Sequence, residues 1–303
     1  IALSATLWAE LPEKKGLDVI NRANAEAYIG FLASDALEGR EAGFRGGRIA
    51  GEYIVSNLKT MGIEPLFESY YQPFEAYNKE RQKKGRFQVH PDSIAKLKQG
   101  VHQKLSMNNI LGKIEGKNPN EYVIIGAHYD HLGFDPMLDG DRVYNGADDN
   151  ASGVSAVLQV AKAFLATGVQ PERTVIFAFW DGEEKGLLGS KYFVQTFLEM
   201  DKVKGYLNYD MIGRNKDESK PMHVVYFYTE AHPVFGDWLK NDIKKYGLNL
   251  TPDYRPWDKP VGGSDNASFA LLDIPVIWYH TDGHPDYHMP SDHVEKINWN
   301  KIV

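Results

Sequence analysis

The feature that most constrains the fold of this chain is a series of short runs of apolar, β-branched and aromatic residues. Longer stretches, in which apolar residues recur at helical spacing, lie between the later runs. Because buried strands that alternate with helices build a covered sheet, the pattern predicts an α/β fold. We expect a single domain with a central mixed, mostly parallel β-sheet flanked by helices on both faces. The predicted strands are Glu121–Ala127, Thr174–Trp180, Val203–Tyr209, Val224–Tyr228 and Ile274–His280, and the predicted helices are Ser152–Ala166, Leu187–Met200 and Pro233–Tyr246.

The first third of the chain is less regular. Asn24–Leu32 and Gly47–Met61 have the apolar spacing of amphipathic helices, and a glycine-rich turn lies between them. The polar stretch Tyr70–Lys104 is only weakly periodic, and we interpret it as two strands plus an excursion. The sequence therefore predicts one domain over residues 1–303, with a small irregular excursion at about residues 67–108.

Composition and charge exclude several classes of site. The formal net charge is −7, so no excess of basic side chains is available for a nucleic-acid backbone, and we expect no nucleic-acid partner. The absence of cysteine excludes disulfides, thiolate metal ligands and a cysteine nucleophile. The longest apolar runs fall far short of the ~20 residues of a membrane-spanning helix, which predicts no membrane insertion. The chain begins at Ile1 without a methionine, and removal of a signal peptide or trimming of the N-terminus explains this equally well.

Polar residues follow the predicted strands at the point where each strand ends. In open α/β sheets, ligands bind at the carboxyl ends of the strands. We therefore expect these side chains to meet at one edge of the sheet. They are His128, Asp130, Asp181, Glu183, Glu184 and Asp210.

Two of these strand-end segments have both a chemical and a structural interpretation. Side chains two residues apart face the same way in an extended chain, so Asp130 can accept the ring proton of His128 and fix its tautomer for metal binding. A polar strand end without any ligand explains that pair as well. In the loop 145–153, a carboxylate from Asp148 or Asp149 can bridge two cations, and an Asx-rich turn that caps the following helix is the alternative.

The remaining segments favour a metal centre. Glu183 and Glu184 are adjacent carboxylates that repel each other unless a cation neutralises one and the other transfers protons. A solvated charge run is the alternative, but it explains the flanking glycines less well. Asp210 follows an apolar strand, and His288 lies in a proline-bounded loop after the last strand. Two histidines and three carboxylates make a nitrogen–oxygen site suited to zinc, with manganese or cobalt as substitutes.

The ordered set of segments resembles the co-catalytic zinc aminopeptidases of metallopeptidase family twenty-eight, which includes bacterial leucyl aminopeptidases, glutamate carboxypeptidase II and glutaminyl cyclase. The similarity begins at Phe31–Arg40, which is similar to the leader region of secreted bacterial members. It continues through all five segments in the family's order. The resemblance implies the zinc-exopeptidase fold and an extracytoplasmic location, periplasmic or secreted, which the missing initiator methionine also favours.

The resemblance also implies a role for each site residue. His128 and Asp210 would bind one zinc ion, Glu184 and His288 a second, and Asp149 would bridge the two, with a cis peptide bond after it. Glu183 would act as general base on a water that bridges the two ions. Asp130 would orient His128, and Tyr287 would hydrogen-bond the tetrahedral oxyanion. One departure is Asn266, which stands where many members have a histidine.

The implied activity is that of an aminopeptidase on peptides with a free N-terminus. The short excursion and the lack of a large lid favour a monomer. Three alternatives remain open. A glutaminyl cyclase would use a similar fold with a single zinc. A carboxypeptidase for acidic C-terminal residues would need an arginine cluster, for which Arg142, Arg214 and Arg255 are the candidates by position. A non-catalytic binding domain is disfavoured because every ligand position is filled. The remaining histidines near the motifs match no ligand position, and we expect them around the metal ligands or on the surface: His131, His280 and His284.

Overall fold

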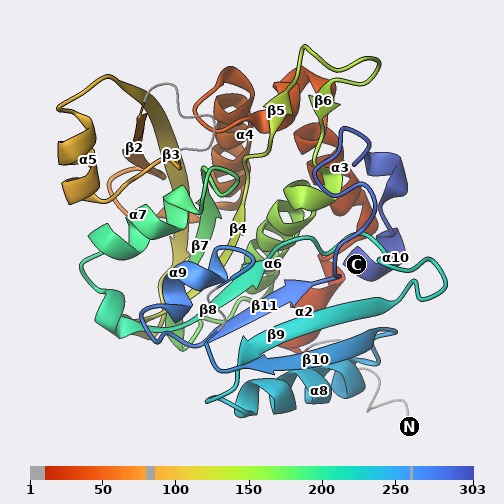
Figure 1. Cartoon of the computed structure of the whole chain (residues 1–303). Coiled ribbons are helices and arrows are strands. Elements are labelled where there is room, and N and C mark those ends of the chain that lie inside the picture. The colour runs from red at the N-terminus through yellow and green to blue at the C-terminus, as the bar shows by residue number, and fades with distance from the viewer. Residues whose placement is uncertain (1–10, 80–85, 260–261) are drawn as a thin grey trace, which may run out of the picture.

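The computed structural model describes residues 11–79, 86–259 and 262–303, and within these ranges nine strands form one central sheet (Figure 1). All five predicted strands belong to it. The strands are β1 (Glu64–Pro65), β2 (Tyr71–Lys79), β3 (His102–Ile114), β4 (Asn118–His128), β7 (Arg173–Trp180), β8 (Val203–Tyr209), β9 (His223–Thr229), β10 (Thr251–Trp257) and β11 (Val276–His280). A separate two-stranded ribbon is formed by β5 (Gly133–Phe134) and β6 (Val143–Tyr144).

The strand order places a parallel block at the centre of the sheet. Strands β7, β4, β8 and β11 are neighbours in that order and run parallel. Antiparallel pairs flank the block, with β3 beside β7 on one side and β9 beside β11 on the other. The predicted central mixed sheet is confirmed. Strands β9 and β10 also pair in parallel, and the block of four strands is the part that ends in the predicted site.

Helices cover both faces of the sheet, as predicted (Figure 1). On one face lie α3 (Arg22–Leu32), α4 (Arg45–Met61) and α6 (Gly153–Thr167), with α2 (Pro12–Asp18) packed on α6, and on the other lie α7 (Leu188–Thr196) and α9 (Asn266–Ala270). Helix α8 (Val234–Tyr246) packs on β9, and α5 (Pro91–Leu97) packs on β2 within the excursion. The short helical turns are η1 (Asp35–Arg40), η2 (Ala147–Ser152), η3 (Met200–Lys202), η4 (Val294–Lys296) and α10 (Trp299–Ile302).

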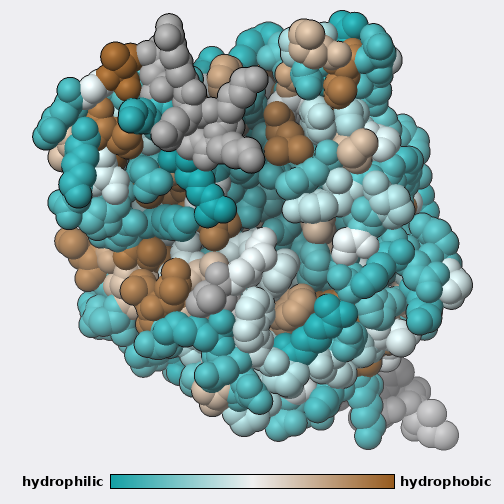
Figure 2. All heavy atoms as spheres, viewed as in Figure 1, coloured by the Kyte–Doolittle hydropathy of each residue, from teal (hydrophilic) through white to brown (hydrophobic). Residues whose placement is uncertain are grey.

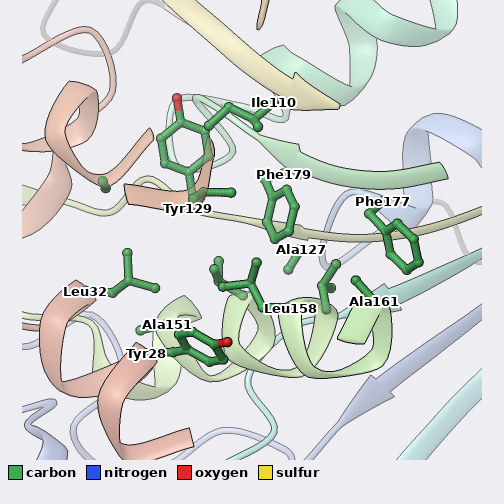
Figure 3. Packing of buried hydrophobic residues seen from close by; sticks show 14 of the residues in the cluster. Tyr28, Leu32, Ile110, Ala127, Tyr129, Ala151, Leu158, Ala161, Phe177 and Phe179 are labelled. Atoms are coloured by element: carbon green, nitrogen blue, oxygen red, sulfur yellow. The ribbon is translucent and has the colours of Figure 1, made fainter. Parts of the chain in front are cut away.

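Strand β7 shows why the site lies where it does. Its alternate residues Val175, Phe177 and Phe179 pack among α3, α4 and α6, and Figure 3 shows Phe177 and Phe179 beside Leu158 and Ala161 of α6. The residues between them face α7 and α9 on the other side. A strand buried on both faces has to be apolar at every position, so the first acidic residues after it lie at the edge of the sheet.

The surface of the molecule is mixed. Figure 2 shows a largely hydrophilic face, with hydrophobic residues gathered over α7 and α9. Among the exposed residues of this region are Leu198 and Leu271. No helix in the described ranges is both long and apolar enough to cross a lipid bilayer.

Candidate functional site

The carboxyl ends of the central strands bring all five predicted metal-ligand positions into one site. His128 ends β4, Glu184 follows β7, and Asp210 follows β8. Asp149 comes from η2 and His288 from the loop after β11. The convergence expected from the strand ends is therefore present in the structure.

A first group of donor atoms surrounds His128. Its Nε2 lies 3.2 Å from Oδ1 of Asp149 and 3.6 Å from Oδ1 of Asp210. One nitrogen and two carboxylate oxygens lie within 4.8 Å of one another, and all three residues are buried. The arrangement offers a nitrogen–oxygen donor set for one cation.

A second group lies on the other side of the Asp149 carboxylate. Nε2 of His288 lies 3.1 Å from Oδ2 of Asp149 and 3.2 Å from Oε2 of Glu184. Nδ1 of His131 lies 2.7 Å from Oε1 of Glu184, and its Nε2 is buried without a hydrogen-bond partner among the described residues. Asp149 thus faces one group with each of its two oxygens. His131, for which the sequence indicated no ligand position, forms a donor group with Asp149 and Glu184 whose ligand atoms lie within 4.8 Å of one another.

The neighbouring carboxylate of Asp148 points away from both groups. Its Oδ1 accepts a hydrogen bond from the backbone N–H of Gly213 at 2.6 Å, and its Oδ2 lies 3.4 Å from Nε2 of His284. Oδ2 of Asp292 accepts the backbone N–H groups of both Asp148 and Asp149, at 2.9 and 3.1 Å. These contacts fix the loop so that Asp149 faces the cluster.

The peptide bond between Asp149 and Asn150 is cis, which confirms the expectation from the family resemblance. Oδ1 of Asn150 accepts the backbone N–H of Gly153 at 3.0 Å, at the start of α6. His280 and His284 are both buried, and Nδ1 of His280 lies 2.6 Å from the carbonyl oxygen of Asp210. His280 therefore contacts the backbone of a predicted ligand, whereas His284 lies beside Asp148.

Arg40 is a structural residue of the site that the sequence analysis did not identify. Its guanidinium is buried and donates to the carbonyl oxygens of Tyr129 at 3.0 Å, Leu32 at 2.6 Å, Asn145 at 2.5 Å and Gly146 at 3.0 Å. Burial lowers its pKa to about 10, so it stays charged at neutral pH. All of these partners are backbone carbonyls, so no side-chain pattern in the sequence could have indicated them.

Asp130 holds the acidic segment that follows β7. Its Oδ1 accepts the backbone N–H of Glu183 at 3.0 Å, and its Oδ2 accepts that of Glu184 at 3.3 Å. Its carboxylate lies 3.7 Å from Nδ1 of His128, and that nitrogen is closer, at 3.3 Å, to the carbonyl oxygen of Asp130. The carboxylate therefore positions the glutamate segment, and its orientation of His128 stays a prediction.

The ionisable groups around the cluster are those expected beside a bound cation. Burial raises the pKa of Glu183 well above its usual range, although His128 opposes this, and Glu184 adds to it. Asp265 is fully buried, and burial raises its pKa to about 7. Burial disfavours protonation of His288, but Asp149 and Glu184 outweigh it and raise its pKa to about 10.

So many buried carboxylates need positive charge nearby, since an unpaired buried anion is costly. The donor set consists of imidazole nitrogens and carboxylate oxygens, which suits zinc. The residues present therefore fit a zinc centre.

Two cavities meet at Glu183. The Trp278 cavity has a volume of about 230 Å³. The Lys191 cavity has a volume of about 590 Å³. Glu183, Tyr287 and His288 line both, and the ring of Tyr287 stacks on that of His288 with centroids 3.8 Å apart. A substrate bond beside Glu183 can therefore place one side in each cavity.

The three arginines named for an acid-specific carboxypeptidase lie elsewhere. Arg214 pairs with Asp286 at 2.7 Å, and Arg255 pairs with Asp282 at 3.0 Å. Arg142 donates to a backbone carbonyl in an exposed loop. None of the three lines either cavity.

Comparisons with known proteins agree with the donor set of this site. Residues 109–303 match the profile of Peptidase family M28. Leupeptin-inactivating enzyme 1 of Streptomyces exfoliatus is 34% identical over 170 residues, which cover 55% of this chain and 34% of that protein. The structure of a zinc aminopeptidase from Bacillus subtilis matches with a TM-score of 0.70 at 17% identity, covering 93% of this chain and 92% of that one. A glutaminyl cyclase from Porphyromonas gingivalis matches with a TM-score of 0.63 at 17% identity, covering 94% of both chains.

These matches confirm the resemblance that the motif order indicated. At this level of identity the two solved structures show the fold, and they confirm the expected α/β architecture. The chain spans about a third or less of the length of the curated relatives it matches.

Proposed function

Because the chain belongs to peptidase family M28, we propose that it is a metal-dependent aminopeptidase, which removes residues from the free amino end of peptides. The observation that carries the proposal is the position of Asp149. Its two oxygens face two donor groups, one buried and one partly exposed at His288, and Glu183 lines both cavities beside this cluster.

The proposal assigns the donors to two zinc ions. His128 and Asp210 would hold one, Glu184 and His288 the other, and Asp149 would contact both. Zinc bound there would supply Lewis-acid chemistry toward the attacking water and the scissile carbonyl. His131, at 2.7 Å from Glu184, would hold that carboxylate in place.

Glu183 is the proposed general base. It accepts a proton from the attacking water as the water oxygen bonds to the carbonyl carbon, and it passes that proton to the amine that leaves when the C–N bond breaks. Burial raises its pKa, which favours a group that both accepts and returns a proton. Asp130 fixes the backbone of this segment, so the carboxylate is held beside the scissile bond.

The Trp278 cavity supports recognition of a free amine. Asp149 and Asp210 in its lining are assigned to zinc, and the carboxylate of Glu183 is left to attract an ammonium group. Among the described residues, no lysine or arginine lines it. Tyr287 borders both cavities, and its hydroxyl is proposed to donate to the oxyanion.

The experiment is elemental analysis of the metal, paired with hydrolysis of a panel of aminoacyl-p-nitroanilides before and after chelation. Close to two zinc ions per chain, with activity lost on chelation and restored by zinc, supports the proposal. One zinc, no hydrolysis and cyclisation of an N-terminal glutamine peptide would replace it with a glutaminyl cyclase.

A variant tests the base directly. Glu183→Gln should lower kcat by about a hundredfold or more with the zinc content unchanged. The control is Glu172→Gln, which removes an exposed carboxylate that pairs with Lys117 at 3.4 Å. Equal activity of the two variants would exclude Glu183 as the base.

Two further expectations belong with this proposal. An extracytoplasmic location is supported by the family resemblance, and fractionation of the native organism tests it. A monomer is expected, and the mass in solution by light scattering tests that.

A further inference from the structure

We propose that the preferred substrates are dipeptides, whose free carboxylate binds to Lys191 and Arg86 in the Lys191 cavity. This inference rests on the proposed aminopeptidase activity and names its substrate class. It follows from the distribution of charge on the two sides of Glu183.

The two cavities differ in charge. Glu183 is the carboxylate of the Trp278 cavity that is not assigned to a metal, and no lysine or arginine among the described residues lines that cavity. In contrast, three basic residues line the Lys191 cavity beyond Glu183: Arg86, Lys185 and Lys191. A zwitterion that spans Glu183 would place its ammonium group on the first side and its carboxylate on the second.

The three basic residues are not equivalent. Lys185 is already neutralised, since its Nζ lies 2.8 Å from Oε1 of Glu41. Lys191 is half-buried on α7, and its Nζ donates to the carbonyl oxygen of Gly186 at 2.8 Å. That bond uses one of its three protons, and neither Lys191 nor Arg86 forms an ion pair with any carboxylate in the described part of the chain.

Arg86 and Lys191 line the same cavity. Burial lowers the pKa of Lys191, and the nearby charge of Arg86 lowers it further, whereas Asp265 and Glu183 raise it. Both side chains line the Lys191 cavity, Arg86 exposed and Lys191 half-buried, so two cations face the space that a substrate would occupy. A substrate carboxylate is an anion that the proposed reaction supplies.

The position of Lys191 in the cavity determines which length of peptide it would recognise. The Nζ of Lys191 is held at the carbonyl oxygen of Gly186, and Lys191, Gly186 and Glu183 line the same cavity. One residue spans at most about 3.6 Å of chain, so the proposal places the carboxylate of the residue just after the scissile bond at these two cations. A longer peptide would place a neutral amide against the two cations.

The test compares four substrates that share the best aminoacyl group, X, from the p-nitroanilide panel. They are the dipeptide X-Ala, its amide X-Ala-NH2, the tripeptide X-Ala-Ala and the acidic amide X-Glu-NH2. We expect kcat/KM for X-Ala to exceed that for X-Ala-NH2 and X-Ala-Ala by about tenfold, the effect of one charge-assisted contact. This comparison uses the unmodified protein, so it does not depend on the folding of a variant.

Variants then test which residues bind the substrate carboxylate. Lys191→Met should reduce the ratio of kcat/KM for X-Ala over X-Ala-NH2 to near one, Lys191→Arg should restore it, and Arg86→Gln should lower it in part. The matched control is Lys162→Met, which changes a half-buried lysine of α6 that lines neither cavity. This control should keep the full ratio.

The outcomes separate this inference from the proposed function. Equal kcat/KM for X-Ala and X-Ala-NH2 in an active enzyme would overturn the dipeptide assignment and leave the aminopeptidase standing. A preference for X-Glu-NH2 over X-Ala would overturn it in favour of an acidic side chain as the bound carboxylate. If the protein hydrolysed none of the peptides and none of the p-nitroanilides, the proposed function itself would be overturned.

Discussion

Replacing Arg40 by methionine should destabilise the protein far more than a surface change does. The side chain is 1% exposed and makes four hydrogen bonds of 2.5–3.0 Å to backbone carbonyls. Hydrogen bonds from a charged donor contribute about 1.5–3 kcal/mol each, and methionine would leave those carbonyls buried without partners. Even with part of the loss recovered by relaxation, we expect Arg40→Met to lower the free energy of unfolding by about 4 kcal/mol.

The assay is urea denaturation followed by tryptophan fluorescence, with unfolding free energies compared at equal slope. The control is Arg22→Met, which removes an exposed arginine that pairs with Glu26 on one helix and should cost about 0.5 kcal/mol or less. A loss below about 1 kcal/mol for Arg40→Met, with an unchanged slope, would refute the argument that these carbonyls depend on Arg40.

Three other predictions concern charge. Zinc uptake should release protons at neutral pH, because the carboxylates beside His288 raise its pKa to about 10 in the metal-free protein; calorimetry in two buffers of different ionisation enthalpy measures this, and buffer-independent heats would contradict it. Asp149→Asn should lower the zinc content below that of Asp210→Asn, because Asp149 faces both donor groups; elemental analysis decides, and equal contents would argue against a shared ligand. Asp282 is partly buried, but Lys216 and Arg255 lower its pKa to about 2, so its carboxylate stabilises the fold above about pH 4 and loses this effect as pH falls toward 2. Asp282→Asn should therefore have a lower Tm than the parent protein at pH 7, and the difference should shrink toward pH 3; a constant difference would exclude the ionic origin.

The central strands and the convergence of the site could be predicted because both follow from burial. Strand β7 is apolar at nearly every position since both of its faces are covered. The acidic residues that follow it are then forced to the edge of the sheet, where the ends of β4 and β8 also lie. The choice of Asp149 over Asp148 came from the family resemblance, and the structure places Asp149 between the two donor groups.

Other features depend on partners that a sequence pattern does not identify. Strand β10 was not predicted, because its two prolines and its charged residues are unlike a buried strand; it is tolerated at the sheet edge, where it pairs only with β9. The predicted helix Leu187–Met200 ends at Thr196, and helix α5 lies in the excursion that showed only weak periodicity. His131 approaches Glu184, 53 positions further along the chain, only after folding.

Three charged side chains to which neither a metal nor a substrate is assigned hold the backbone around the proposed metal ligands and the proposed base. Asp130 accepts the N–H groups of the glutamate segment, Asp292 accepts those of the η2 loop, and Arg40 donates to the carbonyls around that loop. Charge-assisted hydrogen bonds in a buried site are strong, so the ligand positions are set by the protein before any cation binds. The motif residues alone would therefore not rebuild this centre on another sheet, because the geometry between Asp149 and Glu184 comes from these backbone contacts.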